Sequence, residues 1–220
     1  MRSFFLSLTL ISNVACATMQ ADYPTHWWEQ IPETQRQGSW EILPHEAKNG
    51  ELILSKRNEL GVFSNLAYAP FKLDGIHYNS VEALWQMMKY PDFSDTNDVR
   101  MDFASEFPFT REQVYLLSGF ESKRAGDAAN VINKKYDLKS IISYQKKTFD
   151  YKDHAVGSEY HYQIMKRAIL AKVMADKNML RLLNQTKGLK LMPDHKQGAN
   201  KPKSYFYHKI LMDIRDSKID

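Results

Sequence analysis

The chain has 220 residues, of which 43% are hydrophobic and 25% charged, a composition that excludes a disordered or fibrous protein. Thirty Lys and Arg residues against 26 Asp and Glu residues give a formal net charge of +4, which permits phosphate-bearing partners without requiring them. A single cysteine excludes any disulfide within the chain.

Residues 1–17 have the features of a signal peptide, because one charge at Arg2 precedes the apolar residues 4–11 and small residues follow up to Ala17. We therefore predict cleavage after Ala17 and a periplasmic or secreted location. The apolar stretch is far shorter than the ~20 residues of a membrane span, so no span is expected. Two alternatives stay open: a lipoprotein with its lipid on Cys16, and an uncut N-terminal helix in a cytosolic protein.

Residues 18–50 are predicted to form an N-terminal arm, and residues 51–220 a single domain. The arm contains three tryptophans and three prolines without a sustained period, which indicates an extended segment that packs over the domain. No internal repeat and no linker rich in Gly, Ser or Pro divides the rest of the chain.

The first half of the domain predicts a small antiparallel sheet. Residues 52–54 and 61–63 are typical of short strands. Asp74-Gly75, between the apolar runs 71–73 and 76–78, is a strong signal for a β-hairpin.

After Tyr78 the hydrophobic period becomes helical. Val81, Leu84, Trp85 and Met88 form one stripe at helical spacing. Later helix starts are predicted at Thr110, Asp137, Ser158 and Asp176, and residues 205–214 are again amphipathic. The expected fold class is α+β, a mostly helical single domain with a small antiparallel sheet.

Familiar catalytic motifs are missing from the sequence. It holds no Gly-rich phosphate loop, serine-hydrolase elbow or zinc-binding helix, so neither a metal nor a cofactor is predicted. Basic residues between 187 and 203, followed by Tyr205, Phe206 and Tyr207, have two interpretations. They form either a phosphate- and base-binding stretch or a solvated loop that leads into a packed helix.

Residues 61–89 carry the most specific pattern, GVFSNLAYAPFKLDGIHYNSVEALWQMMK. This segment resembles the YbiA-like family, also called NADAR, in both the order and the spacing of its residues. The matching positions are Phe63-Ser64-Asn65, Pro70, Asp74-Gly75, Tyr78, Ser80, Glu82, Gln86 and Lys89. Weaker similarity extends the resemblance to about residues 59–215, and it implies a YbiA-like fold.

The resemblance also implies cleavage of N-glycosidic bonds, in phosphorylated riboflavin-pathway intermediates or in ADP-ribose attached to a nucleobase. Three family features are replaced in this chain. Ala83 stands in place of a histidine, no tryptophan precedes Met165, and Asp194 to Gly198 lie near the position of a W-G-x-G element.

Cleavage of a ribose C–N bond builds positive charge on the sugar and negative charge on the departing base. A carboxylate at Glu82 and a cation at Lys89 supply the two opposite charges, and we predict both residues as catalytic. Glu82 would either stabilise the positively charged ribose or activate the attacking water. With Asn79 as helix cap, Lys89 would lie two turns after Glu82 on the same face. The structural alternative is a capping box, in which Glu82 only stabilises the helix start at Asn79.

Eight further side chains are predicted to bind substrate: Asn65, Ser64, Phe63, Trp85, Gln86, Lys172, Asp153 and Asp194. Trp85 either stacks on the base or belongs to the core. The same two interpretations apply to Phe63 and to the aromatic run that begins at Tyr205. Lys89 and Lys172 either hold phosphate or are solvated charges. Asp153, Glu159 and Asp194 are reserve acids.

The sequence thus predicts an exported N-glycosidase that acts on a ribosylated base, a nucleotide or an ADP-ribose ligand, with ADP-ribosylated nucleic acid as a further partner. One alternative is a module that binds ADP-ribose or a nucleotide without turnover. Another is a structural protein of the cell envelope.

Overall fold

A computed structural model describes residues 23–154, 156–198 and 200–217 of the chain. The predicted signal peptide and Cys16 lie outside these residues. The described helices are α2 (Val81–Met87), α3 (Arg111–Tyr115), α4 (Gly119–Lys135), α5 (Gly157–Ala175), α6 (Lys177–Gln185) and α7 (Tyr207–Asp216). The strands are β1 (Glu51–Ile53), β2 (Phe71–Leu73), β3 (Ile76–Tyr78), β4 (Ile141–Tyr144), β5 (Lys147–Asp150) and β6 (Lys190–Met192). Short 3-10 helices are η1 (Thr25–Trp28), η2 (Glu33–Gln35), η3 (Pro44–Glu46), η4 (Glu59–Phe63), η5 (Val99–Glu106) and η6 (Lys203–Tyr205).

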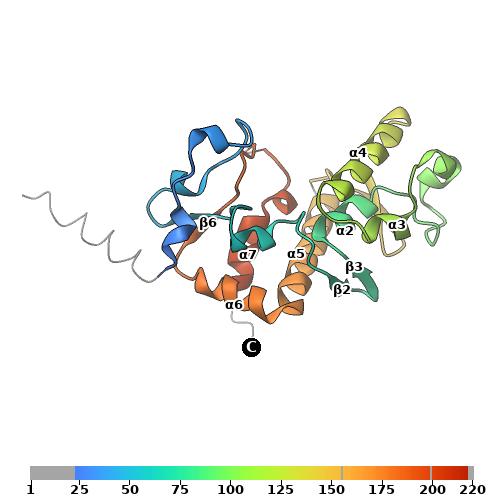
Figure 1. The fold of residues 1–220 in the computed structure, drawn as a ribbon. Helices are drawn as coiled ribbons and strands as arrows, with labels where there is room; N and C mark the ends of the chain where they lie inside the picture. Colours follow the sequence, from blue (N-terminus) through green and yellow to red (C-terminus); the bar gives the residue numbers. More distant parts are fainter. Residues whose placement is uncertain (1–22, 155, 199, 218–220) are drawn as a thin grey trace, which may run out of the picture.

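Helix α5 runs through the middle of the molecule, with α2, α3 and α4 on one side and β6 and α7 on the other (Figure 1). It packs against α2, α6, α7, η6 and strand β2. Its buried residues include Ile164, Met165 and Ala168, which lie on one face at helical spacing. These contacts confirm the expected α+β class, mostly helical within one domain.

The strands pair in three separate two-stranded sheets rather than in one. The predicted hairpin is confirmed as β2 and β3, and Asp74 and Gly75 adopt φ angles of 48° and 86°, the left-handed pair that a tight hairpin turn needs. The predicted strand near residue 52 is β1, but it pairs in parallel with β6 from the far end of the chain. The small antiparallel sheet is therefore limited to the hairpin, and the strand near residue 52 does not belong to it.

Two local predictions were also wrong. Residues 61–63 belong to the 3-10 helix η4, because the Asn58 side chain accepts a hydrogen bond from the Leu60 amide and starts a turn there. Asp137 does not begin a helix. With a φ of 59° it follows the end of α4, and Asp is one of the few residues that tolerate this left-handed conformation.

Other helix boundaries were predicted correctly. Thr110 and Gln113 form a reciprocal capping box at the start of α3, and the Asp176 side chain accepts from the Asn178 amide at the start of α6. Helix α5 begins at Gly157, one residue before the predicted Ser158. Helix α4 carries no such cap hydrogen bond, and its start was not predicted.

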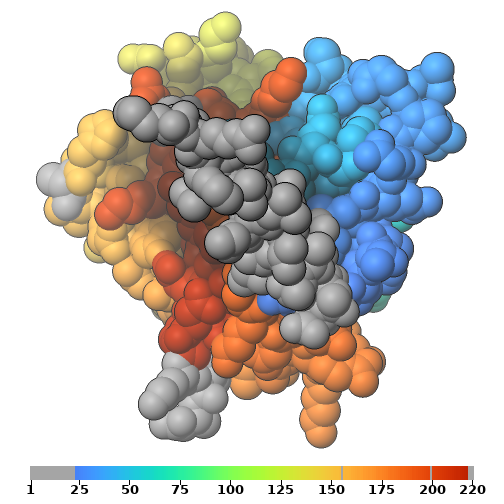
Figure 2. Space-filling view, turned by 90° about the vertical axis from the view of Figure 1, so that its left-hand side faces the viewer, coloured from blue at the N-terminus to red at the C-terminus, as the bar shows by residue number. Residues whose placement is uncertain are grey.

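The segment that precedes β1 consists of the turns η1, η2 and η3 and lies next to the C-terminal segment (Figure 2, blue beside red). Trp27 is fully buried, and its indole donates to Glu59 at 2.7 Å. The backbone amide of Ile42 donates to the Asp194 carbonyl at 2.9 Å, and that of Lys196 to Trp40 at 2.9 Å. The C-terminal part of the chain is thereby tied to the early residues.

Within the described residues, none of the helices combines the length and the apolar character that a membrane crossing requires. The same residues contain no group of three or more His, Cys, Asp or Glu side chains arranged to hold a metal ion.

Candidate active site

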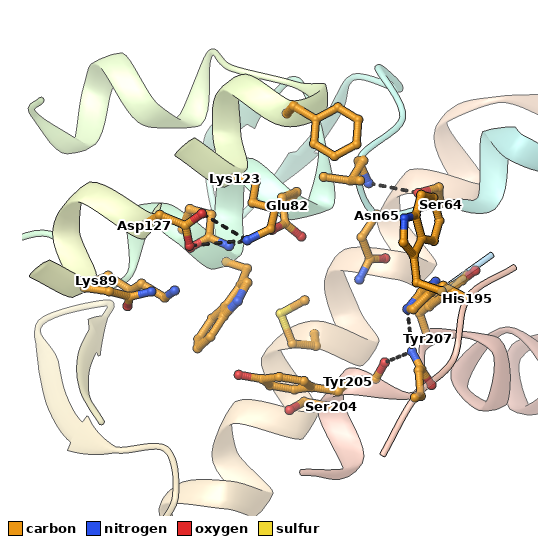
Figure 3. Close-up of a pocket in the computed structure, with 18 of the residues that line it drawn as sticks. Ser64, Asn65, Glu82, Lys89, Lys123, Asp127, His195, Ser204, Tyr205 and Tyr207 are labelled. Carbon is orange, nitrogen blue, oxygen red and sulfur yellow. Dashed lines mark hydrogen bonds and ion pairs between the residues drawn. The ribbon is translucent and has the colours of Figure 1, made fainter. Parts of the chain in front are cut away.

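A cavity of about 590 Å³ lies between α2, the first half of α4, α5 and the C-terminal segment. Pockets for small ligands typically fall in this size range. Figure 3 labels ten of the residues that line the cavity. The full set is Trp40, Lys56, Ser64, Asn65, Leu66, Glu82, Trp85, Gln86, Lys89, Phe120, Lys123, Asp127, Asn130, His161, Met165, His195, Lys196, Gln197, Ser204, Tyr205 and Tyr207.

Glu82 reaches this cavity from the first turn of α2. The side chain of Ser80, not that of Asn79, caps the helix by accepting from the Ala83 amide at 3.0 Å. The predicted Asn79 cap was wrong, because its side-chain amide instead donates to the Leu116 carbonyl. The Glu82 carboxylate accepts from the Gln86 side chain at 2.6 Å, so it takes no part in a capping box.

The Glu82 carboxyl lies in an environment that favours its protonated form. Burial raises its pKa, while the hydrogen bond from Gln86 and the positive charge of Lys89 act in the opposite direction. The pKa remains above its ordinary value. A carboxyl group of this kind is suited to exchange protons closer to neutral pH than an exposed glutamate.

Lys89 lies just beyond the C-terminal end of α2, one residue after the helix cap Met88. Its ammonium group is 4.9 Å from the centre of the Trp85 ring, a cation–π distance. Burial lowers the pKa of Lys89 to about 8, although the charge of Glu82 opposes this shift. Among the described residues, no carboxylate lies within 4.0 Å of the Lys89 nitrogen, so its charge is available to a ligand.

Aromatic rings form the wall beside Lys89. The Trp85 ring centre lies 4.3 Å from that of His161 and 6.1 Å from that of Tyr205. Trp85 is only 8% exposed and also packs in the core. Its two interpretations, base-stacking surface and core residue, are therefore compatible at this position.

His161 is a pocket residue that sequence analysis missed. Its Nδ1 is 3.0 Å from the Ser204 hydroxyl, and its Nε2 is buried without a hydrogen-bonding partner among the described residues. Burial, assisted by the charge of Lys89, lowers the pKa of His161 to about 3, so the ring is neutral at physiological pH. Its position one turn before Met165, on the inward face of α5, was the available signal.

Six of the ten predicted site residues line the cavity together: Ser64, Asn65, Glu82, Trp85, Gln86 and Lys89. The loop that carries Asn65 is joined to α2, because the Glu82 amide donates to the Asn65 carbonyl at 2.9 Å. The side-chain oxygen of Asn65 is buried without a hydrogen-bonding partner among the described residues. It is therefore ready to accept a hydrogen bond from a ligand hydroxyl.

The other four predicted residues do not line the cavity. Phe63 is a core residue, and Asp153 is exposed in the turn before α5. Asp194 is buried and contacts two lining residues, Lys56 and His195.

Lys172 supports the pocket from behind. It is almost completely buried and donates to the Ser64 carbonyl at 2.8 Å, which leaves it unable to meet a phosphate in the cavity. Burial lowers the pKa of Lys172 to about 7. The residue therefore holds the loop that carries Asn65.

Gly126 on α4 lets Gln86 reach Glu82. A Cβ atom at Gly126 would lie 1.6 Å from the Gln86 side-chain oxygen, too close for any real contact. We expect Gly126→Ala to displace Gln86, break its bond to Glu82 and destabilise the fold by about 1–3 kcal/mol. Urea denaturation measures the loss of stability, and an assay of base release measures the effect of the displaced Gln86.

Gly198→Ala is the matched control for this substitution, since the nearest atom to its Cβ would be 3.9 Å away. Equal stability of the Gly126 and Gly198 variants would contradict the close packing of α4 on α2.

Comparisons with known proteins add one distant likeness. No protein-family model matches the chain, and no curated protein matches it. The chain is similar to the NMR structure of the E. coli protein YbiA, with 21% identity over 74% of this chain and 82% of that one and a TM-score of 0.44. A likeness this distant transfers no residue's role to this chain.

Proposed function

We propose that this chain is an N-glycosidase that hydrolyses the bond between a ribose and a base in a ribosylated base, a nucleotide intermediate or an ADP-ribose conjugate. The observation that carries the proposal is the placement of Glu82 and Lys89 in one cavity of about 590 Å³ beside the Trp85 ring. A carboxylate, a cation and an aromatic surface match the sugar, the leaving base and its ring.

The sugar is assigned to the region between Glu82 and Asn65. As the C–N bond breaks, positive charge grows on the ribose, and the Glu82 carboxylate stabilises it. The unpartnered Asn65 oxygen accepts from a ribose hydroxyl. Gln86 holds the carboxylate in place through its 2.6 Å hydrogen bond.

The base is assigned to the Lys89 side of the cavity. The Trp85 and Tyr205 rings offer it apolar faces, and His161 adds a neutral polar edge. The Lys89 ammonium group stabilises the negative charge on the departing nitrogen and donates a proton to it. Because its pKa is about 8, Lys89 gives up this proton more readily than an ordinary lysine.

The export signal predicted at residues 1–17 leads us to place this activity in the periplasm or outside the cell. There the ligand would be a scavenged nucleotide or ADP-ribose conjugate, or ADP-ribosylated nucleic acid. Fractionation of cells that express the full chain tests the location.

The activity is tested by incubating the full chain with nicotinamide riboside, purine and pyrimidine nucleotides, and ADP-ribosylated nucleosides and oligonucleotides. Chromatography then measures the free base, which we expect from at least one class. Ligand-dependent thermal stabilisation without any released base would instead support the binding module. A result with no thermal stabilisation and no released base would overturn both functions.

A further inference from the structure

A second group suited to proton transfer lines the same cavity. The His195 Nδ1 is 2.9 Å from a carboxylate oxygen of Asp194, and the other oxygen of that carboxylate is paired with Lys56. Asp194 is buried, whereas His195 lines the cavity. A histidine oriented by a buried carboxylate is an arrangement that hydrolases use to move protons.

The hydrogen bonds around His195 determine which ring nitrogen carries the proton. Burial raises the pKa of Asp194, but the bonds from His195 and Lys56 outweigh it and hold the pKa below its ordinary value. The ionised carboxylate accepts a hydrogen bond from the N–H group at Nδ1. The lone pair of the neutral ring then lies on Nε2, the atom that can act as a base.

Gln197 supports the same assignment. Its side-chain nitrogen lies 3.2 Å from the His195 Nε2 and 3.3 Å from the Tyr205 carbonyl oxygen. Since a carbonyl only accepts, this contact fixes the amide with its nitrogen toward both groups. In this orientation the amide donates to Nε2 when the proton of the neutral ring lies on Nδ1.

The imidazole is held firmly in this position. Its ring is nearly parallel to that of Tyr207, with an interplanar angle of 11° and centres 6.5 Å apart. The backbone of His195 forms a β-bridge with Glu41, and the Asp194 carbonyl accepts from Ile42. These bonds make the dyad part of the framework of the cavity.

Figure 3 shows where His195 lies relative to the other reacting groups. Lys89 is at one side of the cavity and His195 at the opposite side, with Glu82 between them. If the base lies toward Lys89 and the sugar beside Glu82, then His195 faces the side of the sugar from which water can attack.

We propose that His195, oriented by Asp194, is the general base that activates the attacking water in the N-glycosidase reaction. This inference rests on the proposed function and deepens it, because it leaves Glu82 to stabilise charge on the sugar. The water takes the place of the Gln197 amide at Nε2.

In this step the Nε2 atom accepts a proton from water while the water oxygen bonds to the anomeric carbon. The C–N bond breaks, and its electron pair goes to the base nitrogen, which takes a proton from the Lys89 ammonium group. His195 later returns its proton to solvent, and Lys89 regains one. No oxidant, reductant or metal takes part.

Removing the imidazole and supplying another nucleophile tests the proposal. For His195→Ala, we expect kcat to fall by about 100-fold or more on a substrate that the wild type cleaves. Sodium azide attacks without losing a proton, so it should restore turnover and yield a ribosyl azide that mass spectrometry detects. His77→Ala, an exposed histidine on β3, should keep the wild-type rate and form no azide product.

A readout without turnover accompanies this assay. Nitrogen-15 NMR of the wild-type histidines at pH 7 should show His195 protonated on Nδ1, and Asp194→Asn should shift the proton toward Nε2. Asp194 acts as a positioning residue, so azide should also rescue its variant. A proton on Nε2 in the wild type would overturn the proposal.

Two kinetic results would also overturn it. One is a wild-type rate in His195→Ala; the other is an inactive, folded His195→Ala that azide neither rescues nor converts to a ribosyl azide. In either case base release by the wild type would leave the N-glycosidase assignment intact. A wild type that releases no base from any substrate would instead refute the proposed function and this step with it.

Discussion

Glu82→Gln should lower kcat for base release by about 10²–10³-fold while the protein stays folded, because it removes the negative charge that faces the sugar. The amide keeps the size of the side chain and can still accept the 2.6 Å hydrogen bond from Gln86. Steady-state kinetics on any substrate cleaved by the wild type measures this loss.

The stability of the Glu82→Gln variant provides the second half of the test. The folded-state pKa of Glu82 is raised, so the folded protein binds this proton more tightly than the unfolded chain. The stability that the group contributes is therefore present at low pH and is lost as pH rises through the folded-state pKa. The ionised carboxylate opposes folding, so above the folded-state pKa of Glu82 the Glu82→Gln variant should be at least as stable as the wild type in urea.

Ser80→Ala is the control that separates catalysis from helix capping. The Ser80 side chain caps α2, so its removal should cost about 1 kcal/mol and leave the folded enzyme active. An active Glu82→Gln protein that has lost as much stability as Ser80→Ala would show that Glu82 serves the helix alone.

Lys89→Met should also lower kcat, by about 10²-fold, because the departing base loses its cation and proton donor. The wild type should show a rate that declines above pH 8, since the pKa of Lys89 is about 8 and its ammonium form is required. Lys89→Arg keeps its charge at much higher pH, so the residual rate of this variant should not decline in that range. Measuring kcat as a function of pH for the wild type, Lys89→Met and Lys89→Arg tests these expectations.

The stability of the wild type should also depend on pH, through the same lysine. Because the folded-state pKa of Lys89 is lowered, charging it opposes folding, and the wild type should gain stability as pH rises from about 8 toward 10.5. Lys72→Met, an exposed lysine on β2, is the matched control and should alter neither profile. A wild-type rate constant that stays level through pH 10 would contradict the role of the Lys89 ammonium group.

Short-range patterns predicted much of the fold. The Asp74-Gly75 turn, the capping box at Thr110 and the cap at Asp176 depend on residues within four positions of one another, and all three are confirmed. Local competition explains one of the errors. Adjacent polar residues, Asn79 and Ser80, were equally able to cap α2, and the Leu116 carbonyl attracts the first of them.

Short-range patterns could not predict which distant residues pair with each other. Strand β1 pairs with β6, which follows it by more than a hundred residues, and nothing within either strand specifies the partner. His161 and His195 likewise enter the site from α5 and from the C-terminal segment. Asp194, the neighbour of His195, was a predicted site residue, and the spacing of His161 on α5 indicated an inward position, but neither pattern placed the two histidines beside Glu82.

The amino-acid sequence by itself determined that Glu82, Trp85, Gln86 and Lys89 share one short region of α2 and its end, because helical spacing follows from backbone geometry. Tertiary structure alone decided that this region faces a cavity, that Lys172 lies behind it and that the Asp194–His195 dyad closes its other side. It also decided the pKa values of Glu82 and Lys89. Those values depend on the loss of water around each charge, which happens only when α4, α5 and the C-terminal segment pack together.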